Sequence, residues 1–562
     1  LKLTTGNSNV AVGKNALATN SSASNNTAVG TSALTANTTG ANNVAVGQNA
    51  IKTNTTGSHN VAVGASSLAL NTTGSYNSAI GGEDTTGYPS LYSNTTGAYN
   101  VALGNGALSK NTTADNNTAT GYRALYTNTT GASNTAVGYG SLDANVSGNR
   151  AVAIGVNALG SQTFTNSTNN YNVAVGYGAG ESITTAVQNT IIGGACGSSI
   201  TTGSYNSILG VTAGDAITTG ANNTSVGHGS LSANTTASNN TAVGKSALFA
   251  NTTGAQNTAV GEGALGANTT ASYNTALGEN ALASNTTGTQ NVAVGQATLD
   301  TNTTGDNNTA VGRDALTANT TASNNTAVGK AALTANTTGT QNTAVGAQTL
   351  LANTTGNYNV AVGVNTLLSN TTGNNNTALG TYALDSNTTA DHNIGIGASA
   401  LGANTTGGSN VAVGNYALDA NTTANSNTAV GYASLSANTT GSQNVSVGTL
   451  SLAANTTGST GTAVGYEALG SNTTASHNTA IGWRALFANT TGDLNTAVGY
   501  GALDSNITGD RAVAIGVGAL NAQNVSGDTY NTAVGYSAGA AVTTGVENTL
   551  IGGLAGDALT DA

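Results

Sequence analysis

Charged residues are scarce in this chain: they make up 6% of it, where an ordinary soluble domain has about 25%. The 11 lysines and arginines are outnumbered by 22 acidic residues, which leaves a net charge of −11. No basic patch is available to neutralise phosphates, so nucleic acid is not expected as a partner. No apolar run approaches the roughly 18 residues that a membrane span needs, so we expect no membrane insertion by this segment.

Several residue types are almost missing. The 562 residues include one cysteine, Cys196, one proline and no methionine. A lone cysteine cannot form an internal disulfide, so the cysteine content does not indicate a redox compartment. Since no methionine is present even at the start, we interpret the sequence as a processed chain or a piece of a longer array.

One pentapeptide, Asn-Thr-Ala-Val-Gly, is abundant and returns with small changes along the whole length. Taking its closing glycine as position 0, we count 32 repeats from Gly13 to Gly552, almost all 17 residues long. Three repeats are longer, with insertion loops near 82–98, 161–172 and 523–531. A fixed period of this kind indicates a repeat architecture. We therefore expect one continuous array over 1–562 instead of the several domains that the length alone suggests.

The repeat unit reads Gly-x-x-Ala-Leu-x-Ala-Asn-Thr-Thr-Gly-x-x-Asn-Thr-Ala-Val. Asn, Thr and Gly are poor helix formers, and the apolar residues fall in two short clusters separated by turn residues. Each unit is therefore predicted to form one coil with two short strands, Thr-Ala-Val and Ala-Leu-x-Ala. Stacked coils give in-register parallel sheets. The predicted fold class is all-β, a parallel β-solenoid of about 32 coils with one 17-residue coil per repeat.

The apolar positions predict the core. Position −1 is Val, Leu or Ile in almost every repeat and position +4 is usually Leu, so we expect both to face inward. In five repeats this Leu becomes Gly, and the Asn at position +7 becomes Ile, Val or Leu. The exchanging pairs are Gly180/Ile183, Gly197/Ile200, Gly214/Ile217, Gly539/Val542 and Gly556/Leu559. Because the exchange conserves volume, it predicts that this Asn points inward as a buried amide ladder.

The alanine at position −2 is expected on the strand face opposite to the valine, because strand side chains alternate. It stays small in nearly all repeats, with exceptions such as Ser225, Gly395 and Ser446. A solvent-facing position has no steric reason to stay small. We therefore expect an outer alanine face that another chain covers closely, most simply through closed symmetry around the long axis.

Two segments carry a resemblance. Asn-Val-Ala-Val-Gly at 43–47 and Arg-Ala-Val-Ala-Ile-Gly at 150–155 resemble the head repeats of trimeric autotransporter adhesins, the YadA-like family. The Asn-Thr-Ala-Val-Gly…Asn-Thr-Thr-Gly arrays are similar to those of tail-fibre-type proteins. The resemblance covers essentially the whole chain, although the unit is longer than the adhesin head repeat. It implies a left-handed β-roll, a homotrimer, and an extracellular fibre at a cell surface or on a virion.

No pattern indicates catalysis, a cofactor or a metal site. The aspartates at position +5 lie in distant repeats, and the histidines are too far apart to share a metal ion. These residues are Asp143, Asp300, Asp385, Asp419, Asp504, His59, His228, His392 and His477. Cys196 replaces Ala or Ser of other repeats and is expected to be a small buried residue. We expect no enzyme activity.

Aromatic residues recur at position +1, and arginine follows two of them. The candidate surface-contact residues are Tyr122, Arg123, Tyr139, Tyr177, Tyr432, Tyr466, Trp483, Arg484, Tyr500 and Tyr536. Exposed rings of this kind could stack on sugar faces. The alternative, which we favour, is that they lie over the neighbouring repeat or across a subunit contact.

The Asn-Thr-Thr triplets are N-glycosylation sequons, but an inward amide has no room for a glycan; the loop sequon at 166–168 is freer. The predicted function is a non-enzymatic, extracellular structural or adhesive fibre segment with a host-surface or glycan receptor. The alternatives are a ligand-binding solenoid, for ice or glycans, and a self-assembling extracellular filament subunit. The adjacent threonines sit in a turn and would not both face one side, which disfavours ice binding.

Overall fold

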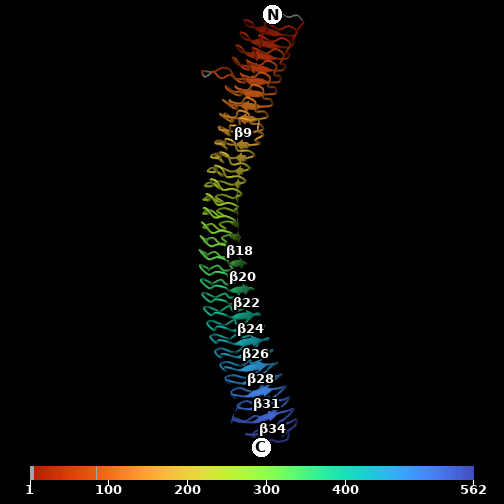
Figure 1. Ribbon diagram of the computed structural model, residues 1–562, viewed down its shortest axis with the longest axis vertical. Coiled ribbons are helices and arrows are strands. Elements are labelled where there is room, and N and C mark those ends of the chain that lie inside the picture. The colour runs from red at the N-terminus through yellow and green to blue at the C-terminus, as the bar shows by residue number, and fades with distance from the viewer. Residues whose placement is uncertain (1–4, 84, 86, 562) are drawn as a thin grey trace. The chain divides into compact units, whose positions relative to one another are not determined.

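The computed structural model describes residues 5–83, 85 and 87–561. They belong to two compact units, Leu1–Thr287 and Gly288–Ala562, and each unit is described by itself. The described residues contain no helix, and each coil contributes one three-residue strand. The predicted fold is confirmed: each unit is an all-β parallel solenoid with one coil per repeat (Figure 1).

In the first unit, each strand pairs in parallel with the strand of the next coil. The strands are β1 (Val10–Val12), β2 (Thr27–Val29), β3 (Val44–Val46), β4 (Val61–Val63), β5 (Ser78–Ile80), β6 (Val101–Leu103), β7 (Thr118–Thr120), β8 (Thr135–Val137), β9 (Val152–Ile154), β10 (Val173–Val175), β11 (Thr190–Ile192), β12 (Ser207–Leu209), β13 (Thr224–Val226), β14 (Thr241–Val243), β15 (Thr258–Val260) and β16 (Thr275–Leu277). Thr241 pairs with Thr258 and Val243 with Val260, so equivalent residues of successive coils are in register.

The second unit follows the same rule. Its strands are β17 (Val292–Val294), β18 (Thr309–Val311), β19 (Thr326–Val328), β20 (Thr343–Val345), β21 (Val360–Val362), β22 (Thr377–Leu379), β23 (Ile394–Ile396), β24 (Val411–Val413), β25 (Thr428–Val430), β26 (Val445–Val447), β27 (Thr462–Val464), β28 (Thr479–Ile481), β29 (Thr496–Val498), β31 (Val513–Ile515), β33 (Thr532–Val534) and β34 (Thr549–Ile551). A separate two-residue pair, β30 (Gly509–Asp510) with β32 (Gly527–Asp528), lies beside the third insertion.

The strand faces are the reverse of the prediction. The middle residue at position −2 is buried in the three-residue strands from β2 to β33, whereas the Val, Ile or Leu at position −1 lies outside. The cause is the buried leucine at position +4 of the preceding coil, which fills the interior opposite the strand. Where Gly395 replaces the alanine, an added Cβ would lie 3.1 Å from the Ala400 carbonyl oxygen and 3.3 Å from Leu384 Cδ1, so only a side chain as small as that of alanine or serine fits. The alanine is small because it is inside.

Larger residues stand at position −2 only where the preceding coil has glycine at position +4. The pairs are Gly180 and Ile191, Gly197 and Ile208, and Gly539 and Leu550. A Cβ added at Gly197 would lie 3.0 Å from Ile200 Cδ1 and 3.2 Å from Ile208 Cδ1. Two isoleucines thus fill the space of the missing leucine. The predicted exchange between positions +4 and +7 is confirmed, and it involves a third position that the prediction missed.

The second predicted strand, Ala-Leu-x-Ala, is wrong, because this cluster forms a turn. Asp314 and Leu316 at positions +2 and +4 have φ of 60° and 52°, so the backbone cannot run extended there. Hydrogen bonds still join the coils, since the Leu316 N–H donates to the Ala332 carbonyl at 3.0 Å. A left-handed backbone costs a non-glycine residue about 1–2 kcal/mol. The coils with glycine at position +4 avoid this cost at that position.

Glycine is required at position 0 because its backbone has a positive φ and because the backbone of the next coil leaves no room for a side chain. Gly244 has φ of +135°, and a Cβ there would lie 2.5 Å from the Gly261 carbonyl oxygen of the next coil. The pentapeptide therefore ends in glycine because its backbone has a positive φ and lies too close to the next coil to leave room for a Cβ.

Two files of buried asparagine run through the coils, at positions −4 and +7. Asn353 Nδ2 donates to Asn336 Oδ1 at 2.9 Å, and Asn353 Oδ1 accepts from Asn370 Nδ2 at 2.8 Å. Asn353 Nδ2 also donates to the Gly356 carbonyl, to which Asn342 Nδ2 of the other file donates at 2.8 Å. The predicted inward amide ladder is confirmed, and its buried amides generally have the partners that burial demands, Asn506 Oδ1 being an exception.

Candidate functional site

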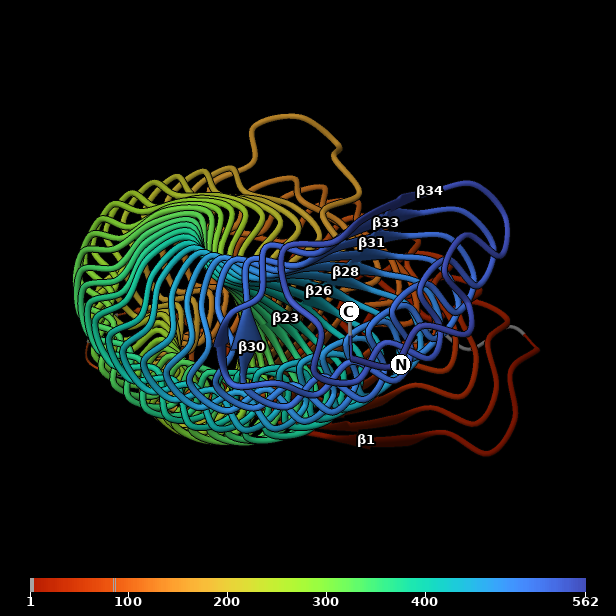
Figure 2. The same ribbon diagram turned by 90° about the horizontal axis from the view of Figure 1, so that it is seen from below.

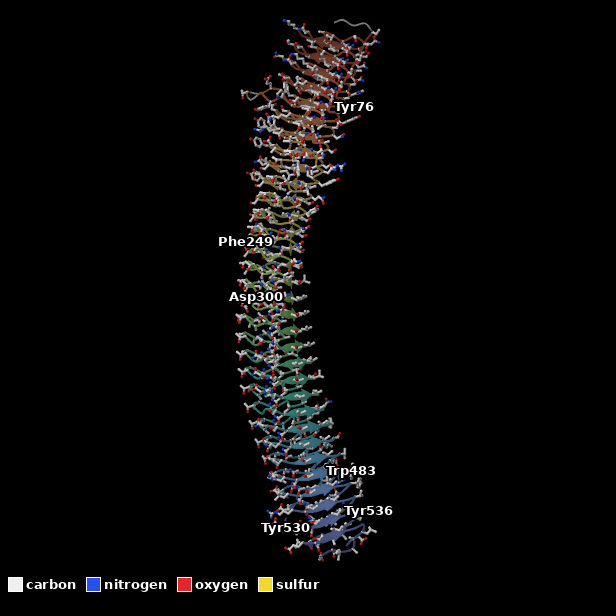
Figure 3. All side chains as sticks on the ribbon, in the orientation of Figure 1. Tyr76, Phe249, Asp300, Trp483, Tyr530 and Tyr536 are labelled. Carbon is white, nitrogen blue, oxygen red and sulfur yellow. The ribbon has the colours of Figure 1, made fainter. Side chains whose placement is uncertain are left out.

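The candidate aromatic residues form stacks between neighbouring coils. The ring centroids of Tyr122 and Tyr139 are 5.6 Å apart. Trp483 stacks on Tyr466 at 6.3 Å and on Tyr500 at 4.6 Å, and it lies on the outside of the second unit (Figure 3). A sugar needs a free ring face to stack on. Neighbouring rings stack on both faces of Trp483, and one stacked ring covers one face of each of the other four.

Two of the three remaining candidate rings are more accessible. Tyr177 and Tyr536 are 69% and 63% exposed, more than the other rings of the set. Tyr432 meets Tyr416 edge to face at 6.0 Å. Tyr177 and Tyr536 follow equivalent insertions in the two units, and they are the candidate rings best placed to contact a ligand.

The two candidate arginines bridge successive coils. The Arg123 guanidinium lies 4.6 Å from the centroid of Tyr126, and its Nη2 lies 3.0 Å from Asp143 Oδ2. Burial raises the pKa of Tyr126 to about 12. Burial also raises the pKa of the Asp143 carboxyl, against the opposing effect of Arg123. The arginine is thus held by its own coil and by the next one.

Arg484 repeats this arrangement in the second unit. Its guanidinium lies 4.0 Å from the centroid of Phe487, and its Nε lies 3.4 Å from Asp504 Oδ1. Glu467 Oε2 is 3.9 Å away on the other side. Sequence reasoning missed the aromatic partner, Tyr126 or Phe487, which the spacing Arg-Ala-Leu-aromatic could have revealed.

A second aromatic stack, at position −5, was also missed. His59 stacks on Tyr76 at 4.7 Å, and Tyr76 stacks on Tyr99 at 5.0 Å, with interplanar angles of 7° and 3°. The signal in the sequence is an aromatic residue at the same position of three successive repeats. These rings also cover one another's faces.

The residues considered for chemistry lie apart. Burial raises the pKa of Asp300, Asp385 and Asp419, each in its own coil. The buried Cys196 thiol donates to the Gly193 carbonyl at 3.0 Å, and burial raises its pKa to about 11. Among the described residues, no three His, Cys, Asp or Glu side chains gather closely enough to hold a metal ion. The described part of the chain also contains no helix long and apolar enough to cross a membrane.

The predicted insertion loops differ in their contacts. In the 82–98 loop, Asp84 and Thr86 lie outside the described residues, and Tyr88 meets Tyr126 edge to face at 4.9 Å. The 161–172 loop stands away from the neighbouring coils of its unit (the gold loop in Figure 2). Its sequon residue Asn166 is exposed, whereas the asparagines of the Asn-Thr-Thr ladder are buried.

The outward side of the strands is the largest regular surface of each unit. It consists of positions −3 and −1, such as Thr241 and Val243 in β14, and we call it the strand face. None of these residues is buried in any three-residue strand. Sequence reasoning placed alanine here, and the surface is instead made of larger, mainly β-branched side chains.

Comparison with models of known protein families and with curated proteins finds no match for this chain.

Proposed function

We propose that this chain is a non-enzymatic structural and adhesive segment of an extracellular fibre, at a cell surface or on a virion. The observation that carries the proposal is the double asparagine ladder. It bonds successive coils through side chains as well as through backbone, so that bending or sliding a coil breaks buried hydrogen bonds. Charges are few, which leaves salt and pH little to disrupt.

The proposal includes an assembly and a receptor. Following the resemblance to YadA-like and tail-fibre repeats, the coils are left-handed and the chain forms a homotrimer. The receptor, on a host surface or a glycan, contacts the 82–98 and 161–172 loops or the exposed Tyr177 and Tyr536. Loops carried by a stiff scaffold are where binding residues concentrate.

Electron microscopy of the purified chain and binding to glycan arrays and host cells test the proposal. We expect stiff particles of constant width whose far-UV circular dichroism is unchanged in high salt. Tyr177→Ala and Tyr536→Ala should weaken binding without changing the circular dichroism. Flexible particles, or a chain that turns over a substrate, would contradict the proposal.

A further inference from the structure

We infer that the strand face of each unit is the surface through which copies of this chain associate. This inference rests on the proposed function, which includes an assembly, and it names the contact surface. The sequence placed that contact on an outer alanine face. The structure buries those alanines, so the surface between copies has to be a different one.

The strand face carries no charge. In every three-residue strand, positions −3 and −1 hold only Val, Ile, Leu, Thr or Ser. Charged residues do occur on both sides of it: Lys245 and Glu262 at position +1 are 2.9 Å apart, and Arg150 and Arg511 stand at position −5. A centre without charged residues, surrounded by a charged rim, is the usual anatomy of a protein interface.

The size of the strand face fits a stable contact. With strands spaced about 4.8 Å apart and three residues spanning about 10 Å, β1 to β16 present roughly 750 Å². A standard interface buries about 800 Å² on each partner.

The repeat itself favours a second copy as the occupant. Thr326, Thr343 and Val328, Val345 recur at one coil spacing, so the face is a series of ridges with a fixed period. A second copy has the same period and can match these ridges at every coil. A partner with another spacing would match them over a few coils and then lose the fit.

Charge on the strand face tests the inference. The variant carries Val311→Lys, Val328→Lys and Val345→Lys, and its matched control carries Thr321→Lys, Thr338→Lys and Thr355→Lys at exposed turn positions of the same region. Sedimentation should give the wild-type chain and the control as a multiple of 54.2 kDa. The strand-face variant should dissociate toward one chain, with association weakened roughly 100-fold or more by the opposed lysines.

Cysteine cross-linking tests the same surface in a way that does not depend on the lysine variant folding. The native Cys196 is buried, so a new cysteine reports on its own position. Val328→Cys should form a disulfide between copies under mild oxidation, and Thr338→Cys should not. Either of two results would overturn the strand face as the contact: an oligomer that persists in the lysine variant, or a disulfide that forms with Thr338→Cys and not with Val328→Cys. Both results would leave the proposed fibre unaffected. A wild-type chain that stays at 54.2 kDa overturns both, and thermal hysteresis by that single chain would assign the strand face to ice.

Discussion

Two groups of coils in the first unit share one backbone plan and differ in their interior. In the coil of Gly244, Leu248 fills the centre and Asn251 Nδ2 donates to Asn234 Oδ1 at 3.0 Å. In the coil of Gly193, glycine replaces that leucine, and Ile200 and an isoleucine of the next strand fill the centre. The strand pairing is the same in both groups. The backbone ladder therefore sets the coil, and the core accepts amide or aliphatic chemistry as long as its volume is kept.

The borders between the two kinds of coil use the same residue type in both units. Gln162 Nε2 donates to Asn145 Oδ1 at 3.3 Å, and Gln162 Oε1 accepts from Asn172 at 2.9 Å. At the equivalent place in the second unit, Gln523 Oε1 accepts from Asn531 at 2.9 Å, whereas Gln523 Nε2 and Asn506 Oδ1 have no hydrogen-bond partner. A longer amide thus ends the position +7 ladder before the aliphatic coils begin.

The largest effect is expected from a charge in the amide ladder. Asn353→Asp removes both side-chain donors, to Asn336 Oδ1 and to the Gly356 carbonyl, and places a carboxylate in the core. We expect a loss of about 3–5 kcal/mol in the local opening free energy at neutral pH. Hydrogen exchange of the backbone amides in the surrounding coils measures it.

Measuring the same loss of stability at acidic pH provides the control for the Asn353→Asp variant. Burial would raise the folded pKa of the new carboxyl above its unfolded value of about 3.9. The protonated acid is therefore the form that folding favours, and the penalty shrinks as the pH falls toward the unfolded pKa. An equal loss at acidic and neutral pH would show that shape, and not charge, is responsible.

The next largest effect on stability is expected from substitutions that convert a coil with a buried amide into one with an aliphatic interior. Leu350→Gly alone should cost about 2–5 kcal/mol, because it leaves a cavity. Adding Asn353→Ile and Ala361→Ile copies the interior of the Gly193 coil and should recover part of that loss. We expect a coupling of about 1–3 kcal/mol between the three sites, measured by hydrogen exchange on the single and combined variants. Purely additive losses would mean that the three positions do not share one space.

A smaller difference is expected between the two arginine bridges. Arg484→Gln should destabilise its coils by about 1 kcal/mol, and Arg123→Gln by less, because Arg484 lies closer to its aromatic partner and near two carboxylates. Thermal unfolding of the two variants, with Arg313→Gln as the control, tests the order. Equal shifts for all three variants would remove any special role for the bridges.

The smallest effect concerns acidification. The folded pKa values of Asp300 and Asp419 are raised by burial. Folding therefore favours their neutral forms, and stability should rise slightly as the pH falls from above the folded pKa toward the unfolded one. Asp300→Asn should reduce this rise in a thermal unfolding series, while Asp306→Asn, at a neighbouring aspartate of the same unit, serves as the reference. A fall in the free energy of unfolding over the same pH range would contradict this prediction.

The period, the register and the inward asparagine could be predicted because each depends on a pattern that the sequence repeats. The orientation of the strand could not be predicted from alternation, since Thr-Ala-Val has the same period on either face. A usable signal was present, however: Ile191, Ile208 and Leu550 occupy the alanine position only after a glycine at position +4. The turn at Leu316 was mistaken for a strand because an apolar residue with φ of 52° has no sequence signature.

The candidate rings at position +1 were expected to lie over the neighbouring repeat, and Trp483 does stack on Tyr466 and Tyr500. The aromatic partners of the two arginines were not predicted. Phe487 and Tyr126 were missed, although the spacing Arg-Ala-Leu-aromatic occurs at both arginines, because this cluster was taken for a strand, in which residues three apart face opposite sides; the turn brings the two together.

The asparagine ladder has a consequence for how such a chain changes length. Each rung gives and receives the same bonds, as Asn353 does with its neighbours above and below. Unequal crossing-over that adds or removes a whole number of rungs rejoins identical donors and acceptors, whereas any other insertion has to leave the stack as a loop. Genes of this kind can therefore lengthen or shorten the encoded solenoid by whole coils without compensating substitutions elsewhere.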